Sequence, residues 1–268
     1  MTNSSPVLSS LRRTPSALLD NPILFVPVLI VMAFQVPQMA LQSIDPILSS
    51  IVSLGLSLVF IVVLPFFQGG LIGMADEALD GRTTLQTFVD DGKSNYVSIL
   101  VAYLALMAIN FALGMIAFFG AIFGGAVLFQ SGGLQSANTA VLAVIAVIVA
   151  IVLLVYLLLV FFAQFYGQAI VLEDMGVADG FKRSISVVRH HLVSTLGYSL
   201  LGAIIGGLAG VVFAAASLIM SPQPTTVVAI PDPSLPIVVG TGLIVVGGML
   251  FGGFFAVYSV SFYRAITR

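Results

Sequence analysis

The side chains that could do acid–base chemistry lie in two short charged segments of this 268-residue chain. Glu77 and Glu173 each follow a long apolar stretch, and a basic residue, Lys93 or Arg189, comes near the end of the charged segment. Two carboxylates could act as a general acid and a general base. We favour a helix cap or an ion pair with Lys93 and Arg189 as the role of these glutamates.

Nucleophiles and metal ligands are scarce in this sequence. It has no cysteine, and its two histidines, His190 and His191, are adjacent. Adjacent side chains on a helix point about 100° apart, so these two cannot chelate one metal ion together. No serine lies at a recognised spacing from a base, and no phosphate-binding loop occurs. We therefore expect no cofactor, no metal and no enzymatic activity.

Uncharged polar side chains inside the apolar stretches are more informative. An amide at the depth of the hydrocarbon needs a hydrogen-bond partner, and in membrane proteins it commonly faces another helix. We expect interhelix contacts at these positions. The alternative is a polar cavity that a neutral or amphiphilic solute enters. The residues are Gln68, Gln164, Gln168 and Asn110.

Each charged segment has the periodicity of an amphipathic helix. Thr83 or Thr84 can cap the first helix, and Asp179 can cap the second. Such helices lie in the plane of the membrane interface, with their basic residues toward water or headgroups. One alternative is that these residues contact lipid headgroups or a docking partner. The other is that they are solvated charges on a helix that only links two spans. They are Lys93, Lys182, Arg183 and Arg189.

The composition indicates which elements must position these residues. Apolar residues make up 59% of the chain and charged residues 7%, and the mean hydropathy is +1.17. A soluble domain has about 25% charged residues, so an ordinary soluble globule is excluded, as is disorder. The net charge of −2 indicates no nucleic-acid partner. We predict an all-α, polytopic membrane helical bundle embedded in the lipid bilayer.

Six apolar stretches are long enough to cross a bilayer. All nine basic residues fall near the termini or in the two charged segments. If the chain crosses the membrane six times, the termini and both charged segments lie on the same side of the membrane. The positive-inside rule therefore predicts cytoplasmic termini, a cytoplasmic segment over residues 1–20 and a multi-pass domain of the cell membrane over 21–268. The expected spans are about 22–42, 48–75, 96–129, 138–172, 192–220 and 236–263.

An internal repeat relates the two charged segments. A shift of 96 residues aligns Gln68 with Gln164, and it aligns the two glutamates and the two basic residues that end the segments. Both copies run through the membrane in the same direction, which predicts a parallel repeat.

Glycines recur every four residues in the last two spans, where such ridges let helix backbones approach closely. We predict that the fifth and sixth spans pack against each other, and the same ridge could serve a homo-oligomer. The glycines are Gly202, Gly206, Gly210, Gly248 and Gly252.

Five segments in and beside the charged regions carry a family resemblance: GLIGMADEALDGRT (70–83), GKSNY (92–96), QFYGQAI (164–170), DGFKRSISVVR (179–189) and LGY (196–198). They resemble an uncharacterised family of integral membrane proteins from halophilic archaea. The chain is also distantly similar to the membrane domain attached to some glycerophosphodiester phosphodiesterases, which is their non-catalytic part. The resemblance implies a membrane helical bundle of unknown role, with no catalytic residues to carry over.

Three hypotheses about function remain. We favour a non-enzymatic bundle that acts in membrane organisation, in lipid or protein handling, or as a partner subunit, because no charge lies within a span. The alternative is a transporter or channel for a neutral or amphiphilic solute, lined by the amides. The third is a lipid-modifying enzyme that uses Glu77 and Glu173 at the interface.

Overall fold

The computed structural model describes residues 5–44, 46–130, 139–220 and 234–268, and its regular structure there is entirely helical, as predicted. A single 3-10 turn, η1 (Pro22–Leu24), joins the first two α-helices. The α-helices are α1 (Pro6–Asp20), α2 (Phe25–Ile44), α3 (Pro46–Asp80), α4 (Leu85–Ser94), α5 (Tyr96–Gln130), α6 (Thr139–Ala163), α7 (Tyr166–Leu172), α8 (Val177–His190), α9 (Leu192–Met220) and α10 (Ser234–Thr267).

Five helical stretches of the described residues are long and apolar enough to cross a membrane. A sixth is added if the bent pair Pro6–Asp20 and Pro22–Phe34 is counted as one span. The first predicted span, 22–42, corresponds to η1 and α2, which together run from Pro22 to Ile44. The fourth predicted span, 138–172, is interrupted between Ala163 and Tyr166, so that it consists of α6 followed by the short α7.

Within the segment before the first predicted span, Pro6–Asp20 forms the helix α1. The Ser5 side chain accepts a hydrogen bond from the backbone of Leu8 and caps α1. α1 meets the next helical segment at an angle of 94°. The bend falls at Asn21, because the residue before a proline is disfavoured in the helical conformation. The buried face of α1 is Val7, Ser10, Thr14, Ala17 and Leu18.

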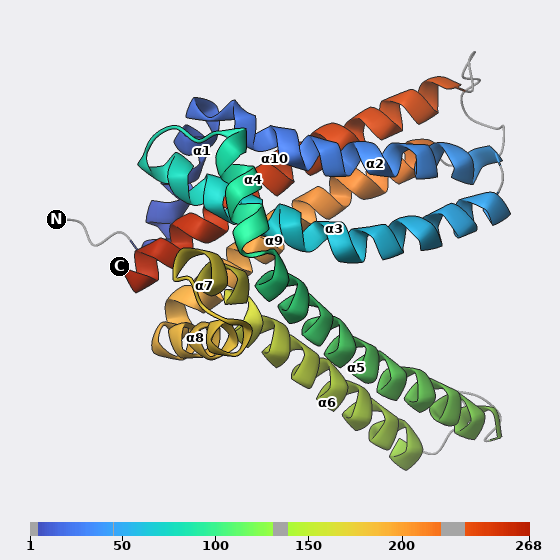
Figure 1. The fold of residues 1–268 in the computed structure, drawn as a ribbon. Coiled ribbons are helices and arrows are strands. Elements are labelled where there is room, and N and C mark those ends of the chain that lie inside the picture. The colour runs from blue at the N-terminus through green and yellow to red at the C-terminus, as the bar shows by residue number, and fades with distance from the viewer. Residues whose placement is uncertain (1–4, 45, 131–138, 221–233) are drawn as a thin grey trace.

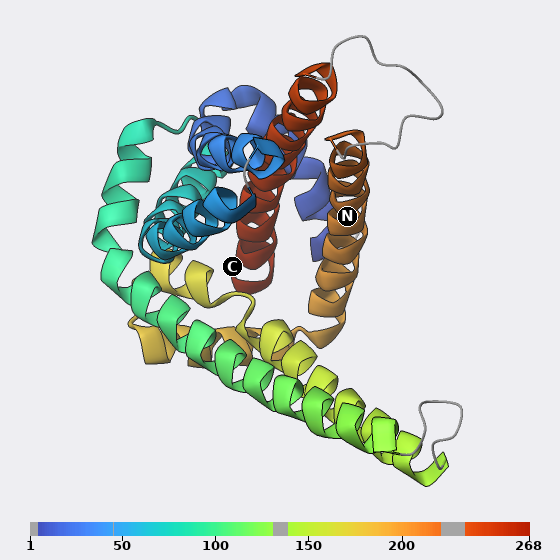
Figure 2. The same ribbon diagram turned by 90° about the vertical axis from the view of Figure 1, so that its right-hand side faces the viewer.

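The long helices form two groups that share one end. α10 packs against α1, α2, α3 and α9, whereas α5 and α6 form a hairpin that leaves this group at an angle (Figures 1 and 2). The short helices α1, α4, α7 and α8 gather at the end of the molecule where the described chain begins and finishes (Figure 1). We call this the charged end, since it carries the ion pairs described below.

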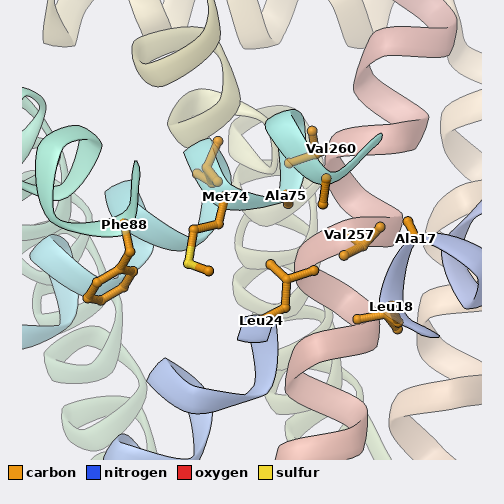
Figure 3. Close-up of a cluster of buried hydrophobic side chains, with 10 residues drawn as sticks. Ala17, Leu18, Leu24, Met74, Ala75, Phe88, Val257 and Val260 are labelled. Atoms are coloured by element: carbon orange, nitrogen blue, oxygen red, sulfur yellow. The ribbon is translucent and has the colours of Figure 1, made fainter. Parts of the chain in front are cut away.

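A cluster of buried apolar side chains lies at the charged end. Leu24, Met74 and Val257 are fully buried there and come from η1, α3 and α10 (Figure 3). Phe88 of α4 joins the same cluster and lies edge-on to Phe66 of α3. By contrast, none of the most apolar window of the span Leu142–Leu172 is buried. The hairpin is therefore held at one end and exposed along most of its length.

The two amphipathic helices predicted in the charged segments are α4 and α8. Thr84 is the N-cap of α4, which confirms one of the two predicted caps. The prediction that Asp179 caps the second helix is wrong, because α8 begins at Val177 and its N-cap is Gly176. Asp179 instead lies in the first turn, where a negative side chain is favoured by the helix dipole.

The helix boundaries follow the repeat of 96 residues. α4 ends at Ser94, and α5 begins at Tyr96. α8 ends at His190, and α9 begins at Leu192, each 96 residues further on. The turn from an amphipathic helix into the next span therefore has the same length in both copies.

α9 and α10 pack against each other, as predicted, but not through the whole predicted ridge. A methyl group added at Gly248 or Gly252 would clash with Met32 or Val28, so these glycines admit side chains of α2 rather than of α9. The contact with α9 uses another position of α10: a methyl group at Gly247 would lie 3.4 Å from Val212.

The α9 half of the ridge lies mostly away from other helices. A methyl group at Gly202 would touch Phe255 of α10 at 3.7 Å, but at Gly206 and Gly210 it would meet nothing within 4 Å. The predicted packing of the fifth span against the sixth is therefore present, but the two halves of the glycine ridge face different surroundings.

Candidate functional site

One carboxylate joins three elements at the charged end. Glu173, which follows α7, accepts hydrogen bonds from Arg183 Nε of α8 at 2.8 Å and from the hydroxyl of Tyr263 of α10. This hydrogen bond raises the pKa of Arg183 above its ordinary value. Of the two roles predicted for Glu173, a helix cap or an ion pair with Arg189, the ion pair is wrong in its partner, because Glu173 pairs with Arg183.

The equivalent glutamate of the first copy binds hydroxyl groups. Glu77 accepts hydrogen bonds from Thr83 at 2.8 Å and from Thr87. Of the two roles predicted for Glu77, a helix cap or an ion pair with Lys93, the ion pair is wrong, since none joins them among the described residues. Thr87 follows Glu77 by ten residues, and Arg183 follows Glu173 by ten residues. The repeat thus keeps the glutamate and the position of its donor, and it changes the chemistry of the donor.

Arg264 of α10 closes the end of α3. Its guanidinium donates to both carboxylate oxygens of Asp80 at 2.8 Å and to the backbone carbonyl of Asp76 at 3.0 Å. The guanidinium also lies 3.4 Å from the Asp76 carboxylate. Nη2 makes both bonds to Asp80 and Nη1 makes the bond to Asp76, so two nitrogens of one guanidinium hold the last turn of α3. The sequence predicts Arg264 only as one of the basic residues near the C-terminus, because its partners lie more than 180 residues earlier in the chain.

Asn21 fixes the bend between α1 and α2 to the α3–α4 turn. Its amide nitrogen donates to the carbonyls of Ala17 and Gly81, and its amide oxygen accepts from the backbone of Thr83 at 2.9 Å. Asn21 is buried, and its contacts with Ala17 and Thr83 are shielded from solvent, whereas the contact with Gly81 is partly exposed. The Asn-Pro step at the start of an apolar stretch was the available signal for this residue.

Asp91 of α4 is a half-buried carboxylate that packs onto a glycine of α3. A methyl group added at Gly73 would overlap the Asp91 side chain, so only glycine leaves room for it. Burial, followed by the charges of Asp90, Glu77 and Asp76, raises the pKa of Asp91 above its ordinary value.

The amides predicted in the spans differ in their surroundings. Gln68 of α3 accepts a hydrogen bond from the Tyr166 hydroxyl of α7 at 3.1 Å. Gln164, between α6 and α7, accepts one from Ser199 of α9 at 3.1 Å. Gln168 is buried in α7. Gln68 and Gln164 therefore both lie at contacts between helices near the charged end.

Asn110 is placed apart from the other three amides. It is exposed on α5, and its amide nitrogen donates to the carbonyl of Leu106 in the same helix at 2.8 Å. It lines a groove of about 1060 Å³ between α5 and α6, the α5–α6 groove. The rest of the lining includes Gly114, Gly120, Val144, Ile148 and Tyr156.

The four predicted basic contacts divide into paired and unpaired residues. Arg183 is bound to Glu173, and Lys182 lies 3.0 Å from Asp179 on the exposed side of α8. Lys93 and Arg189 are exposed in the last turns of α4 and α8 and form no ion pair among the described residues.

In the part of the chain that the structure describes, His, Asp and Glu side chains form no group of three or more that could hold a metal ion. Glu77 and Glu173 have separate sets of hydrogen-bond donors, so the structure joins neither to the other through a shared partner.

No curated protein and no solved structure gives a match to this sequence. A family match does cover nearly the whole chain, over residues 6–266, and its description is "Domain of unknown function (DUF7847)". It spans α1, both charged segments and all the apolar helices. The chain is therefore a member of the DUF7847 family, with the helices of an integral membrane protein.

Proposed function

We propose that this protein is a non-enzymatic lipid-handling bundle and that the α5–α6 groove holds the hydrocarbon chain of a membrane lipid or a related amphiphile. The observation that carries the proposal is the groove itself, about 1060 Å³ between two apolar helices. Ligand sites commonly measure about 300–1,000 Å³, so a long hydrocarbon chain fits within it.

The groove remains open because several residues on its α5 side are glycines, which have no side chain to fill it. A methyl group added at Gly114, Gly120 or Gly125 of α5 would meet nothing within 4 Å. The facing wall from α6 is made of branched residues, including Val144 and Ile148. In hydrocarbon there is no water to fill such a space, so acyl chains supply its van der Waals contacts.

The chemistry of the lining favours an apolar occupant. Asn110 and Tyr156 are the polar side chains of the groove, and the Asn110 amide nitrogen is engaged by its own helix. A transported polar solute would need free hydrogen-bonding groups along its path. Gln68 and Gln164, the amides that the transporter hypothesis needs, already accept hydrogen bonds from Tyr166 and Ser199.

A non-enzymatic role is supported by the contacts of the two glutamates. Each accepts hydrogen bonds from side chains of its own copy of the repeat, and Glu173 also accepts one from Tyr263. A general base must instead be able to reach the proton that it removes.

We further propose that the protein resides in the cell membrane with the charged end in the cytoplasm. The positive-inside rule supports this orientation. The chain has no cysteine, so single cysteines at Arg82 and Thr225 report the orientation directly. A membrane-impermeant thiol reagent added outside intact cells should label the cysteine at Thr225 only. The resemblance to halophilic archaeal proteins and to phosphodiesterase membrane domains remains a prediction.

The test of the proposed function is to fill the groove. Gly120→Leu should reduce the amount of co-purified lipid measured by mass spectrometry, because its side chain would occupy the space of an acyl chain. Gly206→Leu is the matched control, since it adds the same side chain to α9 where a methyl group also meets nothing within 4 Å. Equal lipid loss in both variants, or a hairpin covered by a second copy in cross-linking, would contradict the proposal.

A further inference from the structure

A second, smaller pocket lies where α4 turns into α5. Its volume is about 350 Å³, and it is lined by Val62, Val63 and Phe66 of α3, Lys93 of α4 and Tyr96 of α5. The candidate span on α5 begins at Tyr96 itself, so the pocket lies at the boundary between the apolar and charged parts of the chain. Lysine and tyrosine are typical of that boundary, because their stems are apolar and their ends are polar.

The apolar wall of this pocket is held in place by its neighbours. The Phe66 ring lies edge-on to Phe88 at a centroid distance of 5.3 Å, and it packs so closely on Gly92 that an added methyl group would be 2.8 Å away. The Tyr96 hydroxyl donates to the backbone carbonyl of Val62 at 3.1 Å. These contacts fix the start of α5 against α3 before any ligand arrives.

The ammonium group of Lys93 is available for a ligand. Lys93 is exposed and forms no ion pair within the described ranges. The two acidic residues on the same helix are directed elsewhere: Asp90 accepts hydrogen bonds from Gln86, and Asp91 packs on Gly73. The Lys93 ammonium group beside the apolar lining of this pocket is complementary to a ligand that has both an anionic group and an apolar part.

We infer that this pocket binds an anionic phospholipid, with the phosphate at Lys93 and the first part of an acyl chain along Val62, Val63 and Phe66. A free phosphate would gain the charge contact alone, whereas a phospholipid gains the charge contact and the apolar wall. The site lies among α3, α4 and the first residue of α5 and shares no lining residue with the α5–α6 groove, so it does not depend on the proposed function of that groove.

This inference distinguishes Lys93 from the other three basic residues that the sequence predicts as headgroup contacts. Arg183 and Lys182 already have carboxylate partners, and Arg189 occupies the position equivalent to Lys93 in the second copy. Position 192, which aligns with Tyr96, is Leu192, which lacks the hydroxyl that holds the α5 start to α3. Lys93 is therefore the residue to change.

The test uses the purified full chain in detergent micelles, titrated with phosphatidylglycerol or phosphatidylcholine and followed by native mass spectrometry. Lys93→Gln should weaken phosphatidylglycerol binding about fivefold, since one lysine near a membrane surface contributes about 1 kcal/mol to binding an anionic lipid. Phosphatidylcholine binding should not change. Lys93→Arg should retain phosphatidylglycerol, and Lys182→Gln is the matched control because its ammonium group is bound to Asp179. Far-UV circular dichroism checks that each variant is folded.

Three results would overturn the inference. The first is phosphatidylglycerol binding by Lys93→Gln at the wild-type level. The second is an equal loss in Lys182→Gln, which would indicate a general effect of charge. The third is displacement of phosphatidylglycerol by an equal concentration of inorganic phosphate, which would indicate a site for free anions.

Discussion

Arg183 donates a hydrogen bond to Glu173 at 2.8 Å, across the turn that joins α7 to α8. One repeat earlier Thr87 donates to Glu77 across the turn that joins α3 to α4. Each amphipathic helix is thus tied back to the preceding span through the same position. Only the second copy uses an ion pair for this contact. The second donor to the carboxylate also differs: Thr83 of the adjoining turn binds Glu77, whereas Tyr263 of the distant α10 binds Glu173.

Replacing Arg183 should destabilise the charged end. Arg183→Met removes a charge-assisted hydrogen bond that is partly exposed, and the expected loss in the free energy of unfolding is about 1 kcal/mol. Lys182→Met is the control, because Lys182 and Asp179 are largely exposed and their pair should contribute less than about 0.5 kcal/mol. Thermal unfolding in detergent measures both. Equal destabilisation of the two variants would show that the contact with Glu173 adds nothing specific.

The close approach of α4 to α3 depends on small residues. Gly70→Ala should destabilise the protein by roughly 1–3 kcal/mol, because the added methyl group would overlap the backbone carbonyl of Phe88. Gly55→Ala in the same helix meets nothing within 4 Å and should be neutral or more stable, by up to about 1 kcal/mol. Denaturant titration distinguishes the two, and a neutral Gly70→Ala would contradict the packing of α4.

Asp91 should make stability depend on pH. Its pKa is higher in the folded protein than the ordinary value of 3.8, so the folded state holds the proton more readily than the unfolded state. Stability is therefore lost as the pH rises from the ordinary pKa through the folded-state pKa. Asp91→Asn has no charge and should melt at a higher temperature than the wild type at pH 7. This difference should shrink toward pH 4, and a constant difference would contradict the account.

The hydrogen bond between Gln68 and Tyr166 should contribute to stability rather than to transport. Interhelix hydrogen bonds in membranes contribute about 0.6 kcal/mol on average. Gln68→Leu and Tyr166→Phe should each destabilise the fold, and the double variant should cost less than the sum of the two because both lose the same bond. A double-mutant cycle by thermal unfolding measures this coupling. Additive losses would show that the two side chains act independently.

Local signals in the sequence predict part of this structure. The long apolar stretches predict the spans, and Thr84 predicts the start of α4, because a cap and an apolar run depend only on neighbouring residues. The repeat predicts that Glu77 and Glu173 share a geometry, although the partners expected for them, Lys93 and Arg189, were wrong.

The rest depends on contacts between distant residues. The contact of Arg264 with Asp80 crosses 184 residues, and that of Tyr263 with Glu173 crosses 90. Many pairings of charged and hydroxyl residues are compatible with the same sequence, so composition and spacing do not predict which pairing forms. The sequence also does not predict that the α5–α6 hairpin separates from the other long helices, because a span facing lipid and a span facing another helix are both apolar.

The central claim is that the α5–α6 groove holds a hydrocarbon chain. It is tested most directly by reconstituting the protein with a phospholipid that carries a photoreactive diazirine on its acyl chain and mapping the labelled peptides by mass spectrometry. We expect labelling concentrated on the groove residues of α5 and α6, around Gly120 and Ile148, and reduced there by Gly120→Leu. Labelling spread evenly over the exposed faces of α9 and of the hairpin, and unchanged by Gly120→Leu, would contradict the claim.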